Sequence, residues 1–293
     1  MIRIGIDFGG TKIEAAALAA DGRILARERR PNPGSYDGSI DLVRELVQAV
    51  GPPEATVGMG VPGSVSPKTG MIRNANSTWM NGRPFKQDVE RAIGRPVRVE
   101  NDANCFALSE ASDGAGAGAE VVFGAILGTG CGGGVVVRGK TIEGVNGIAG
   151  EWGHTPLPWP RPSEYPGNNC WCGRGNCLET WISGTGFVED YRAATGEKLT
   201  GAEIVAAGDR EAQAALDRYI DRLSRALAVI CDIIDPDVIV LGGGMSNVEA
   251  LYDRVPGVTA RYAFSDVFET KIVKARHGDS SGVRGAAWLW PLD

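Results

Sequence analysis

The sequence predicts an α/β fold composed of two similar halves. A strand, a glycine turn and a returning strand occur twice, as "IRIGIDFGGTKIEAAAL" from residue 2 and as "VVFGAILGTGCGGGVVV" from residue 121. Helical apolar patterns alternate with apolar strands, which is typical of α/β domains. The 42 glycines cluster at predicted strand ends, where tight turns and close approach to a ligand favour them. A repeat of this kind indicates two related halves.

The first half is predicted to contain four strands and three helices. Apolar residues at helical spacing predict a helix over 40–50, and a short helix over 86–94 ends near Gly94. The other predicted elements are strands over 2–6, 12–18, 56–63 and 96–102 and a helix over 103–112.

The second half begins with the repeated hairpin over 121–140, and its long helix over 211–234 has an apolar stripe. The other predicted elements are a strand over 237–241 that runs into the triple glycine and a helix, a strand over 270–275 and a helix over 280–290. This last helix is expected to pack back onto the first half. We predict two domains, a small one of residues 1–112 plus 279–293 and a large one of residues 113–278.

Composition excludes several classes of partner. The chain of 293 residues has a net charge of −6 and no dense cluster of Lys and Arg, so nucleic acid and anionic membranes are not expected partners. No apolar run approaches the ~20 residues of a membrane span, and the first residues lack the apolar core of a signal peptide. We therefore expect a cytoplasmic protein, in which clustered cysteines are metal ligands rather than disulfides.

The two glycine hairpins suit phosphate binding. Backbone N–H groups at such tips can surround phosphate oxygens without obstruction by side chains, and Asp7, just before the first tip, can hold Mg²⁺ directly or through water. Each motif alone can also be an ordinary glycine hairpin, but the repetition favours a nucleotide site. The candidate nucleotide ligands are Asp7, Gly9, Gly10, Thr11, Lys12, Gly128, Thr129, Gly130, Gly242, Gly243 and Gly244.

"VENDAN" places Asp102 at the carboxyl end of a predicted strand, the edge at which α/β sheets bind ligands. There the carboxylate suits a general base, with Asn101 beside it as a hydroxyl-binding group. The alternative from the local sequence is that Asp102 caps the helix that follows. Both interpretations stay open at this point.

"CWCGRGNC" brings together three thiols, those of Cys170, Cys172 and Cys177. Tetrahedral Zn²⁺ needs a fourth ligand, and the chain has only two histidines. His154 gives the simplest Cys₃His set. Because this set leaves no open position, we expect a structural zinc that holds the surrounding loops. The alternative is three incidental reduced cysteines.

Several polar groups near these cysteines can pair with sugar hydroxyls. They are Glu151, His154 and Glu179, although Glu179 can equally be a surface residue. In "NANSTW", Asn76 and the flat ring of Trp79 also suit a sugar. The stretch "TPLPWPRPSEYPGNN", which follows His154, has two open roles, shaping the sugar site or making a dimer contact.

Over nearly its full length the chain resembles the ROK family of sugar kinases (repressors, open reading frames, kinases). The matching motifs are "GIDFGGTK", "GVPG", "ENDAN", "LGTGCGGG", "GEWGH", "CWCGRGNCLE" and "VLGGG". Within the family, "NANSTW", "GEWGHTPLPW" and "HGDSSGVRGAAWLWP" are similar to bacterial fructokinases and manno(fructo)kinases. "NDANCFALSEA" is shared with N-acetylglucosamine kinases.

The resemblance implies an actin-like ATPase fold of two RNase H-like halves, with ATP and a hexose in the cleft between them. It implies phosphorylation of the C6 hydroxyl, with D-fructose expected first, then D-mannose, and with N-acetylglucosamine or glucose as alternatives. ATP, Mg²⁺ and structural Zn²⁺ are the implied cofactors, and a homodimer is the implied assembly. The implied residues are Asp102 as base, Asn101, Glu151, His154 and Glu179 as sugar contacts, and His154, Cys170, Cys172 and Cys177 as zinc ligands.

Three other classes are disfavoured. A ROK-type repressor has a DNA-binding segment ahead of the kinase-like part, and we expect none here because the first hairpin begins at residue 2. A sugar-sensing protein without catalysis is expected to lack Asp102 or the glycine tips, and both are present. The cysteine cluster and "GEWGH" argue against an actin-like ATPase that uses no sugar.

Overall fold

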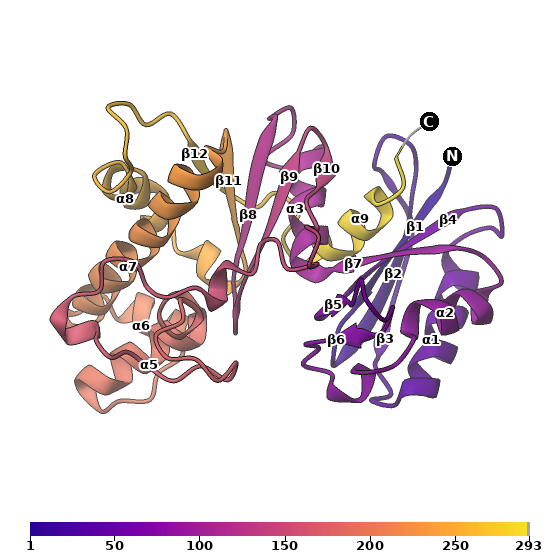
Figure 1. The fold of residues 1–293 in the computed structure, drawn as a ribbon, viewed down its shortest axis with the longest axis horizontal. Helices are drawn as coiled ribbons and strands as arrows, with labels where there is room; N and C mark the ends of the chain where they lie inside the picture. Colours follow the sequence, from indigo (N-terminus) through magenta and orange to yellow (C-terminus); the bar gives the residue numbers. More distant parts are fainter. Residues whose placement is uncertain (292–293) are drawn as a thin grey trace. The chain divides into compact units, whose positions relative to one another are not determined.

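The structure, a computed structural model, describes residues 1–291, and the elements of its first half follow the sequence prediction closely (Figure 1). These elements are β1 (Arg3–Phe8), β2 (Lys12–Leu18), β3 (Ile24–Pro31), α1 (Tyr36–Val50), β4 (Thr56–Val61), β5 (Ser64–Val65), β6 (Ile72–Arg73), η1 (Thr78–Met80), α2 (Phe85–Ile93), β7 (Val97–Asn101) and α3 (Asp102–Asp113).

The second half contains the predicted hairpin, long helix, last strands, helix after the triple glycine and last helix, together with helices between residues 152 and 207 that the sequence did not predict. Its elements are β8 (Val121–Leu127), β9 (Cys131–Val137), β10 (Lys140–Thr141), η2 (Trp152–His154), η3 (Pro162–Glu164), α4 (Glu179–Ile182), α5 (Gly184–Thr195), α6 (Gly201–Ala207), α7 (Arg210–Ile234), β11 (Val238–Gly242), η4 (Gly244–Asn247), α8 (Ala250–Thr259), β12 (Lys271–Lys274), η5 (Gly278–Ser280) and α9 (Ser281–Trp288).

Two five-stranded sheets repeat one topology. The first has the order β3–β2–β1–β4–β7, and the second has the order β10–β9–β8–β11–β12. In the first sheet β4 runs parallel to β1 and β7, and in the second β11 runs parallel to β8 and β12. The α/β fold class and the two similar halves are therefore as the sequence predicted.

The edge strand β3 was not predicted, because its sequence is charged and carries no apolar alternation. Its partner strand explains it. The buried carboxylate of Glu14 on β2 pairs with the guanidinium groups of Arg27 and Arg29 on β3. A charged edge strand is also a common protection against edge-to-edge association.

Contacts within the chain divide it into two compact units. The first contains residues 1–118, 134–150 and 277 onward, and the second contains residues 119–133 and 151–276. The domain boundaries expected from the sequence stay a prediction, because a compact unit is not by itself an independently folding domain.

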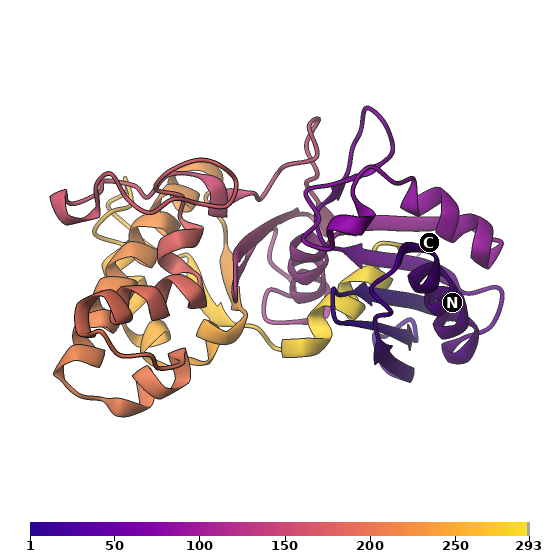
Figure 2. The same ribbon diagram turned by 90° about the horizontal axis from the view of Figure 1, so that it is seen from below.

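In the first unit, helices cover both faces of the first sheet (Figure 2). Helix α1 packs on the face that carries Ile4 and Ile6. Helix α9 lies on the other face at Gly5 and Gly58, where a Cβ would stand only 1.9 Å from a carbonyl oxygen of α9. Glycine at these two positions lets the helix lie directly on the strands, and the last helix packs onto the first half as predicted.

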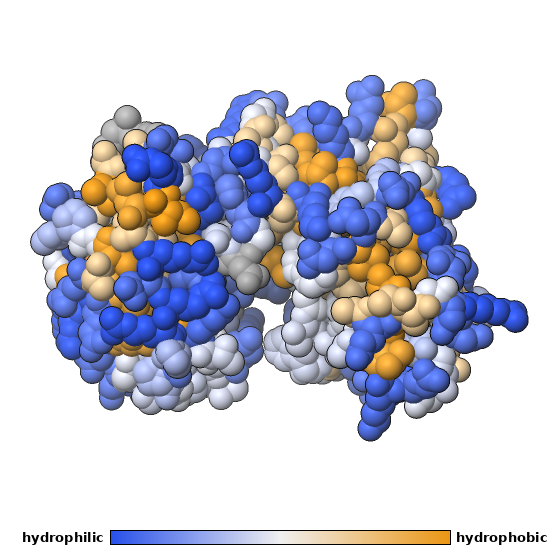
Figure 3. Space-filling model, turned by 180° about the vertical axis from the view of Figure 1, so that it is seen from behind, coloured by the Kyte–Doolittle hydropathy of each residue, from blue (hydrophilic) through white to orange (hydrophobic). Residues whose placement is uncertain are grey.

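The second unit is built around α7, whose apolar stripe is buried. The Asp209 side chain caps this helix by accepting a hydrogen bond from the N–H of Ala212 at 2.8 Å. None of the helices within residues 1–291 has both the length and the apolar character required to cross a bilayer. On the face drawn in Figure 3, hydrophilic side chains surround separate apolar areas on each unit.

Candidate active site

The tip of the first hairpin is exposed and tightly folded. The N–H of Gly9 donates to the carbonyl of Lys12 at 3.0 Å, and a Cβ on Gly9 would stand 2.8 Å from that oxygen. Asn32, which follows β3, donates its side-chain N–H to the Gly9 carbonyl at 2.7 Å and its backbone N–H to the Thr11 carbonyl at 2.9 Å. Gly10, Thr11 and Lys12 are thus presented to solvent on a braced turn.

Asn32 was missed by the sequence reasoning. It lies 23 positions along the chain from Gly9, whose carbonyl it binds. No local pattern marks it, because its role depends on the pairing of β2 with β3.

The N-terminus of α3 presents Asp102. The N-cap is Asn101, whose side-chain oxygen accepts from the N–H of Ala103 at 2.9 Å and whose amide donates to the Gly63 carbonyl at 2.8 Å. The interpretation of Asp102 as the cap is therefore wrong. Asp102 is the first helical residue and is exposed, and the positive end of the helix dipole favours its negative charge.

Three carboxylates lie near enough to the buried thiol of Cys105 to influence its pKa. Burial, and then the charges of Glu100, Asp7 and Asp102, raise the pKa of Cys105 well above its ordinary value. Asp7 and Asp102 therefore lie in one neighbourhood of the first unit. Gly282 makes room for Asp7, because a Cβ there would stand 2.9 Å from the Asp7 carboxylate.

Glu100 is the buried member of this group. Burial raises the pKa of Glu100 to about 7, hydrogen bonds from Asn104 and Asn101 oppose this shift, and the neighbouring Glu143 adds to it. A carboxyl group that titrates near neutrality thus lies two residues before Asp102.

Asn76 is exposed on a segment that is closed by Asn81. The Asn81 side chain exchanges two hydrogen bonds with the backbone of Ala75, at 2.9 and 3.0 Å. Trp79, expected to face a sugar, is half-buried, and its ring contacts that of Phe8 with centroids 6.0 Å apart. Core packing therefore accounts for Trp79.

The tip of the second hairpin is held by Glu179. The N–H of Cys131 donates to Glu179 Oε2 at 3.0 Å, and a Cβ on Gly130 would stand 2.6 Å from the same oxygen. A side chain at position 130 would displace this carboxylate from the place it now occupies. Glu179 is half-buried and hydrogen-bonded, so it is not an incidental surface residue. The N–H of Gly184, at the start of α5, donates to the carbonyl of Gly128 at 2.7 Å.

The triple glycine lies against the same hairpin. Gly243 has a φ of +80°, and a Cβ at this position would stand 2.5 Å from the backbone of Leu127. Gly243 and Gly244 are exposed. The second unit therefore brings Gly128, Thr129 and Gly130 together with the triple glycine.

The structure brings His154, Cys170, Cys172 and Cys177 together. Their ligand atoms lie within 4.8 Å of one another, with 3.6 Å between Cys170 Sγ and His154 Nδ1 and 3.6 Å between Cys172 Sγ and Cys177 Sγ. Tetrahedral Zn²⁺ with bonds of ~2.3 Å to sulfur separates its ligands by roughly 3.8 Å. The soft donor set and its spacing therefore fit Zn²⁺.

Metal binding by these thiols has to displace protons. Burial raises the pKa of Cys177 to about 12, whereas a backbone hydrogen bond from Arg174 lowers the pKa of Cys172. The affinity for a metal is therefore expected to depend on pH.

The segment that carries Glu151 and His154 lies flat on β9. A Cβ on Gly153 would stand 2.0 Å from the Cys131 carbonyl, and the indole N–H of Trp152 donates to the Gly132 carbonyl at 2.8 Å. These contacts hold Trp152 and Gly153 against β9. On either side of them, the Glu151 side chain is exposed and the His154 ring turns Nδ1 toward Cys170.

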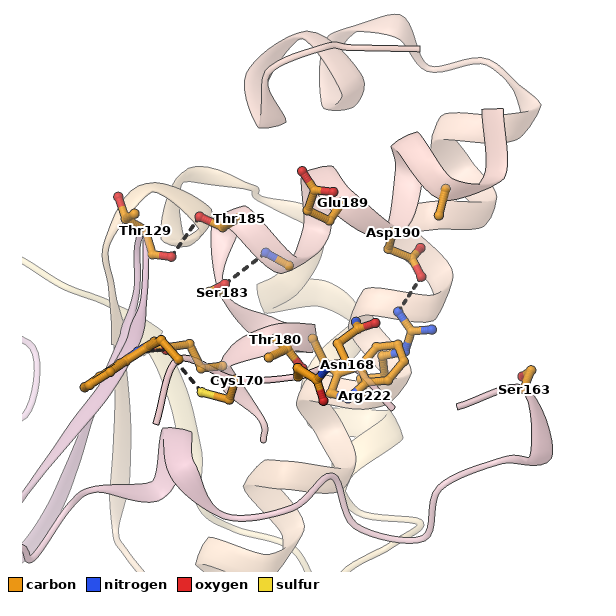
Figure 4. A pocket seen from close by; sticks show the side chains of 16 residues that line it. Thr129, Ser163, Asn168, Cys170, Thr180, Ser183, Thr185, Glu189, Asp190 and Arg222 are labelled. Atoms are coloured by element: carbon orange, nitrogen blue, oxygen red, sulfur yellow. Dashed lines mark hydrogen bonds and ion pairs between the residues drawn. The ribbon is translucent and has the colours of Figure 1, made fainter. Parts of the chain in front are cut away.

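A cavity of about 700 Å³ lies in the second unit, beside the group of His154 and the three cysteines (Figure 4). It runs from Thr129, at the hairpin tip, past Glu179 to Asp190 and Arg222. Its other walls include Asn168, Asn169, Cys170, Trp171, Thr180, Trp181, Ser183, Thr185 and Glu189. Amides, hydroxyls and aromatic rings of this kind suit a polyhydroxylated ligand.

The insert that follows His154 is tied to α7 by buried charges. Glu164 is 4% exposed and pairs with Arg222 and Arg225, each at 2.8 Å. Arg225 also donates to the carbonyls of Pro158 and Trp159 at 2.8 and 2.9 Å. Although burial opposes it, the hydrogen bonds from Arg225 and Arg222 lower the pKa of Glu164.

This geometry can be compared with known proteins. The sequence matches the ROK family over residues 3–292. The chain belongs to the ROK family. The resemblance drawn from the sequence motifs is thereby confirmed, and the fold is the actin-like ATPase fold that it implied.

Relatives and solved structures cover nearly the whole chain. An N-acetyl-D-glucosamine kinase of Photobacterium profundum is 41% identical over 97% of this chain and 98% of its own length. The crystal structure of a ROK hexokinase from Thermus thermophilus has a TM-score of 0.86 at 31% identity, covering 98% of this chain and 97% of its own. A ROK family glucokinase from Streptomyces griseus, in complex with glucose and AMPPNP, has a TM-score of 0.80 at 30% identity and covers 99% of both chains.

The finer expectation of a fructokinase-like member is not confirmed. The relatives from Photobacterium profundum and Salmonella paratyphi C are named N-acetyl-D-glucosamine kinases, and the second is 40% identical over 99% of this chain. N-acetylglucosamine was an alternative substrate in the sequence analysis.

Proposed function

We propose that this protein transfers the γ-phosphoryl group of ATP to the C6 hydroxyl of a hexose. The observation that carries the proposal is the exposed carboxylate of Asp102 at the N-terminus of α3, in one neighbourhood with Asp7. The 41% identity to a curated sugar kinase over 97% of the chain supports it. The bound glucose and AMPPNP of the Streptomyces griseus glucokinase supply the matching ligand classes.

Each glycine hairpin has a part in nucleotide binding. The N–H groups of Gly9, Gly10, Thr11 and Lys12 and those of Gly128, Thr129 and Gly130 bind phosphate oxygens, and Gly242 to Gly244 take the adenosine. Asp7 holds Mg²⁺, directly or through water, since a hard cation prefers carboxylate and water oxygens. Phosphoryl transfer needs mainly such positioning and charge stabilisation.

Asp102 accepts the proton of the C6 hydroxyl as its oxygen attacks the γ-phosphorus in line. Asn101 cannot move freely, because its side chain is fixed by Ala103 and Gly63, and it places the hydroxyl beside Asp102. The proposed sugar contacts are Asn76, Asn101, Asp102, Glu151, His154 and Glu179.

His154, Cys170, Cys172 and Cys177 hold a structural Zn²⁺. By holding the ion together, these four residues would tie the loop that carries the cysteines to the segment of Glu151 and His154. With Nδ1 of His154 directed at the cysteines, Nε2 is left for a sugar hydroxyl. We expect about one zinc per chain by elemental analysis. Full stability and activity of protein with the zinc stripped out would overturn this role.

N-acetyl-D-glucosamine is the first candidate substrate, because the curated relatives at about 40% identity bear that name. D-fructose and D-mannose are the second candidates, on the "NANSTW" and "GEWGHTPLPW" motifs. A homodimer remains an expectation of the family resemblance.

The test is release of ADP by purified protein with ATP and Mg²⁺ in the presence of single sugars. The panel is N-acetyl-D-glucosamine, D-fructose, D-mannose, D-glucose, N-acetyl-D-mannosamine and no sugar. Sugar-dependent release with a hexose of the panel is expected. Release without any dependence on sugar, or none from zinc-replete protein, would favour an ATPase or a sugar-sensing protein instead.

A further inference from the structure

Trp171 has no part in the phosphoryl transfer described above, yet its side chain is firmly fixed. It stands between the ligand residues Cys170 and Cys172 and is 72% exposed. Exposure of a single aromatic ring needs no explanation by itself, but Trp171 is also held by a hydrogen bond to Glu179 and lines a cavity. Its position beside the cavity of the second unit is therefore worth explaining.

The indole N–H of Trp171 fixes Glu179. It donates to Glu179 Oε1 at 2.6 Å, while Glu179 Oε2 accepts from the N–H of Cys131 at 3.0 Å. One oxygen is therefore held by the cysteine loop, residues 170–177, and the other by the second hairpin. A carboxylate held in this way keeps its remaining lone pairs in fixed directions, which suits recognition of a hydroxyl.

The ring of Trp171 also touches His154. The two rings are T-shaped, with centroids 5.1 Å apart and an interplanar angle of 83°. Trp171 therefore contacts two of the three side chains of the second unit, Glu179 and His154 but not Glu151, that the proposed function assigns to the sugar.

The other six tryptophans have their rings against another ring or a guanidinium group. Trp79, Trp152 and Trp159 lie against Phe8, Phe123 and Tyr262, and Trp181, Trp288 and Trp290 lie under arginines. Trp159, the next most exposed at 52%, stacks on Tyr262 at 11°. Trp171 also has an aromatic neighbour, His154, but it is the most exposed of the seven tryptophans.

We propose that Trp171 is a positioning and specificity residue of the sugar site. Its N–H holds the Glu179 carboxylate, and its exposed ring is a platform for the C–H face of a pyranose. An aromatic face and a carboxylate side by side match a sugar ring, which offers C–H groups on its face and hydroxyls at its edge. This inference rests on the proposed function, because it takes Glu179 and His154 as sugar contacts.

The platform predicts a preference among ring forms. N-acetyl-D-glucosamine, D-glucose and D-mannose can offer both a flat pyranose face and a free C6 hydroxyl. D-fructose has a free C6 hydroxyl only when its ring is the five-membered furanose, because C6 oxygen closes the pyranose form. Removal of the Trp171 ring should therefore weaken the binding of the aldohexoses more than the binding of D-fructose.

The test uses Trp171→Phe, which keeps a ring and removes the N–H donor, and Trp171→Leu, which removes both. KM, kcat and sugar affinity by calorimetry are measured for N-acetyl-D-glucosamine and D-fructose. Loss of a hydrogen bond to a charged group predicts a KM for N-acetyl-D-glucosamine roughly 10-fold higher in Trp171→Phe. Trp171→Leu should add roughly a further 3- to 10-fold, with kcat changed much less in both.

Three controls separate this role from a structural one. Zinc content and melting temperature show whether the cysteine loop is intact, and Trp159→Phe is the matched substitution of an exposed tryptophan in the same unit. The double variant Trp171→Phe with Glu179→Gln should bind sugar no more weakly than Glu179→Gln alone, because Trp171 acts through that carboxylate.

The possible outcomes are distinct. Absence of sugar-dependent turnover in the wild-type protein would reject the proposed function itself. Wild-type turnover with unchanged KM in both Trp171 variants would overturn this inference alone. If sugar affinity falls equally in Trp171→Phe and Trp171→Leu, or falls equally for both sugars, the ring of Trp171 is not a platform for the pyranose. If Trp171→Leu loses its zinc, the additivity of Trp171→Phe with Glu179→Gln decides, and full additivity would contradict the inference.

Discussion

The two glycine hairpins occupy the same place in two copies of one topology, but their surroundings differ. The first tip, Gly9 to Lys12, is braced by the amide of Asn32, and carboxylates of its unit gather near Cys105. The second tip, Gly128 to Gly130, is braced by the carboxylate of Glu179 and by the start of α5. Glu179 also accepts a hydrogen bond from the indole N–H of Trp171, which belongs to the cysteine loop.

The difference indicates a division of labour within the proposed kinase. In the proposed mechanism the first unit supplies the groups that act on the reacting atoms, Asp102 and Asp7. The second would supply the sugar contacts Glu151, His154 and Glu179, beside the proposed zinc ligands. Substitution of Asp102 or Asp7 should therefore lower kcat, and substitution of Glu179 should raise KM.

The largest effect is expected from Asp102→Asn. General-base removal commonly lowers rates by about 10²- to 10⁴-fold, and the amide preserves the shape of the side chain. Steady-state kinetics should show this fall in kcat with sugar affinity nearly kept. The matched control is Asp37→Asn, at another exposed position in the first turn of a helix of the same unit. Wild-type turnover by Asp102→Asn would remove Asp102 from the mechanism.

Glu179→Gln tests the second unit. The amide cannot accept from both Cys131 and Trp171 as the carboxylate does, and charge-assisted hydrogen bonds to the sugar are lost. We expect KM for the preferred sugar to rise roughly 10- to 100-fold, with a smaller change in kcat. Glu211→Gln, in the first turn of α7, is the control. A fall in kcat at constant KM would contradict the division of labour.

Glu164→Gln tests the buried ion pairs that hold the insert. Arg222 keeps its pair with Asp190 and Arg225 its pair with Asp221, but both lose the buried carboxylate that they share. The loss in the free energy of unfolding should therefore be about 3 kcal/mol, at the low end for a broken buried ion pair. Asp217→Asn breaks an exposed pair with Arg254 and should lose less than about 1 kcal/mol. Urea unfolding measures both, and equal midpoints would show that the insert is not anchored through Glu164.

The smallest effect concerns Glu100 and pH. Its pKa in the fold, about 7, is raised from the ordinary 4.5, so its contribution to stability is complete below pH 4.5 and declines as the pH rises through 7. In Glu100→Gln, the side-chain oxygen can still accept from Asn101 and Asn104. The variant should gain stability relative to wild type from pH 5 to pH 8, by of order 1 kcal/mol. Parallel stability curves over this range would contradict the assignment.

The sequence predicted what local patterns can encode. Apolar strands, glycine turns and their repetition predicted two similar α/β halves, and cysteine spacing predicted the group of His154 with Cys170, Cys172 and Cys177. In each case the residues that define the pattern lie close together in the chain or repeat in order.

What the sequence did not reveal depends on contacts between distant polar groups. Asn32 holds Gly9, Glu179 holds Cys131 and Glu164 holds Arg225, and none of these pairs follows a short-range rule. Local sequence also could not decide whether Asn101 or Asp102 caps the helix, because both residue types are good caps. The end of β7 decides it, since it gives Asn101 the extended backbone of a cap.

The most direct test of the central claim is ³¹P NMR of the product made from ATP, Mg²⁺ and N-acetyl-D-glucosamine by the wild-type protein and by Asp102→Asn. We predict a hexose 6-phosphate, identified by coupling of phosphorus to the C6 protons, that forms with wild type and is nearly absent with the variant. Inorganic phosphate as the sole product, or a sugar phosphate formed equally well by Asp102→Asn, would contradict it.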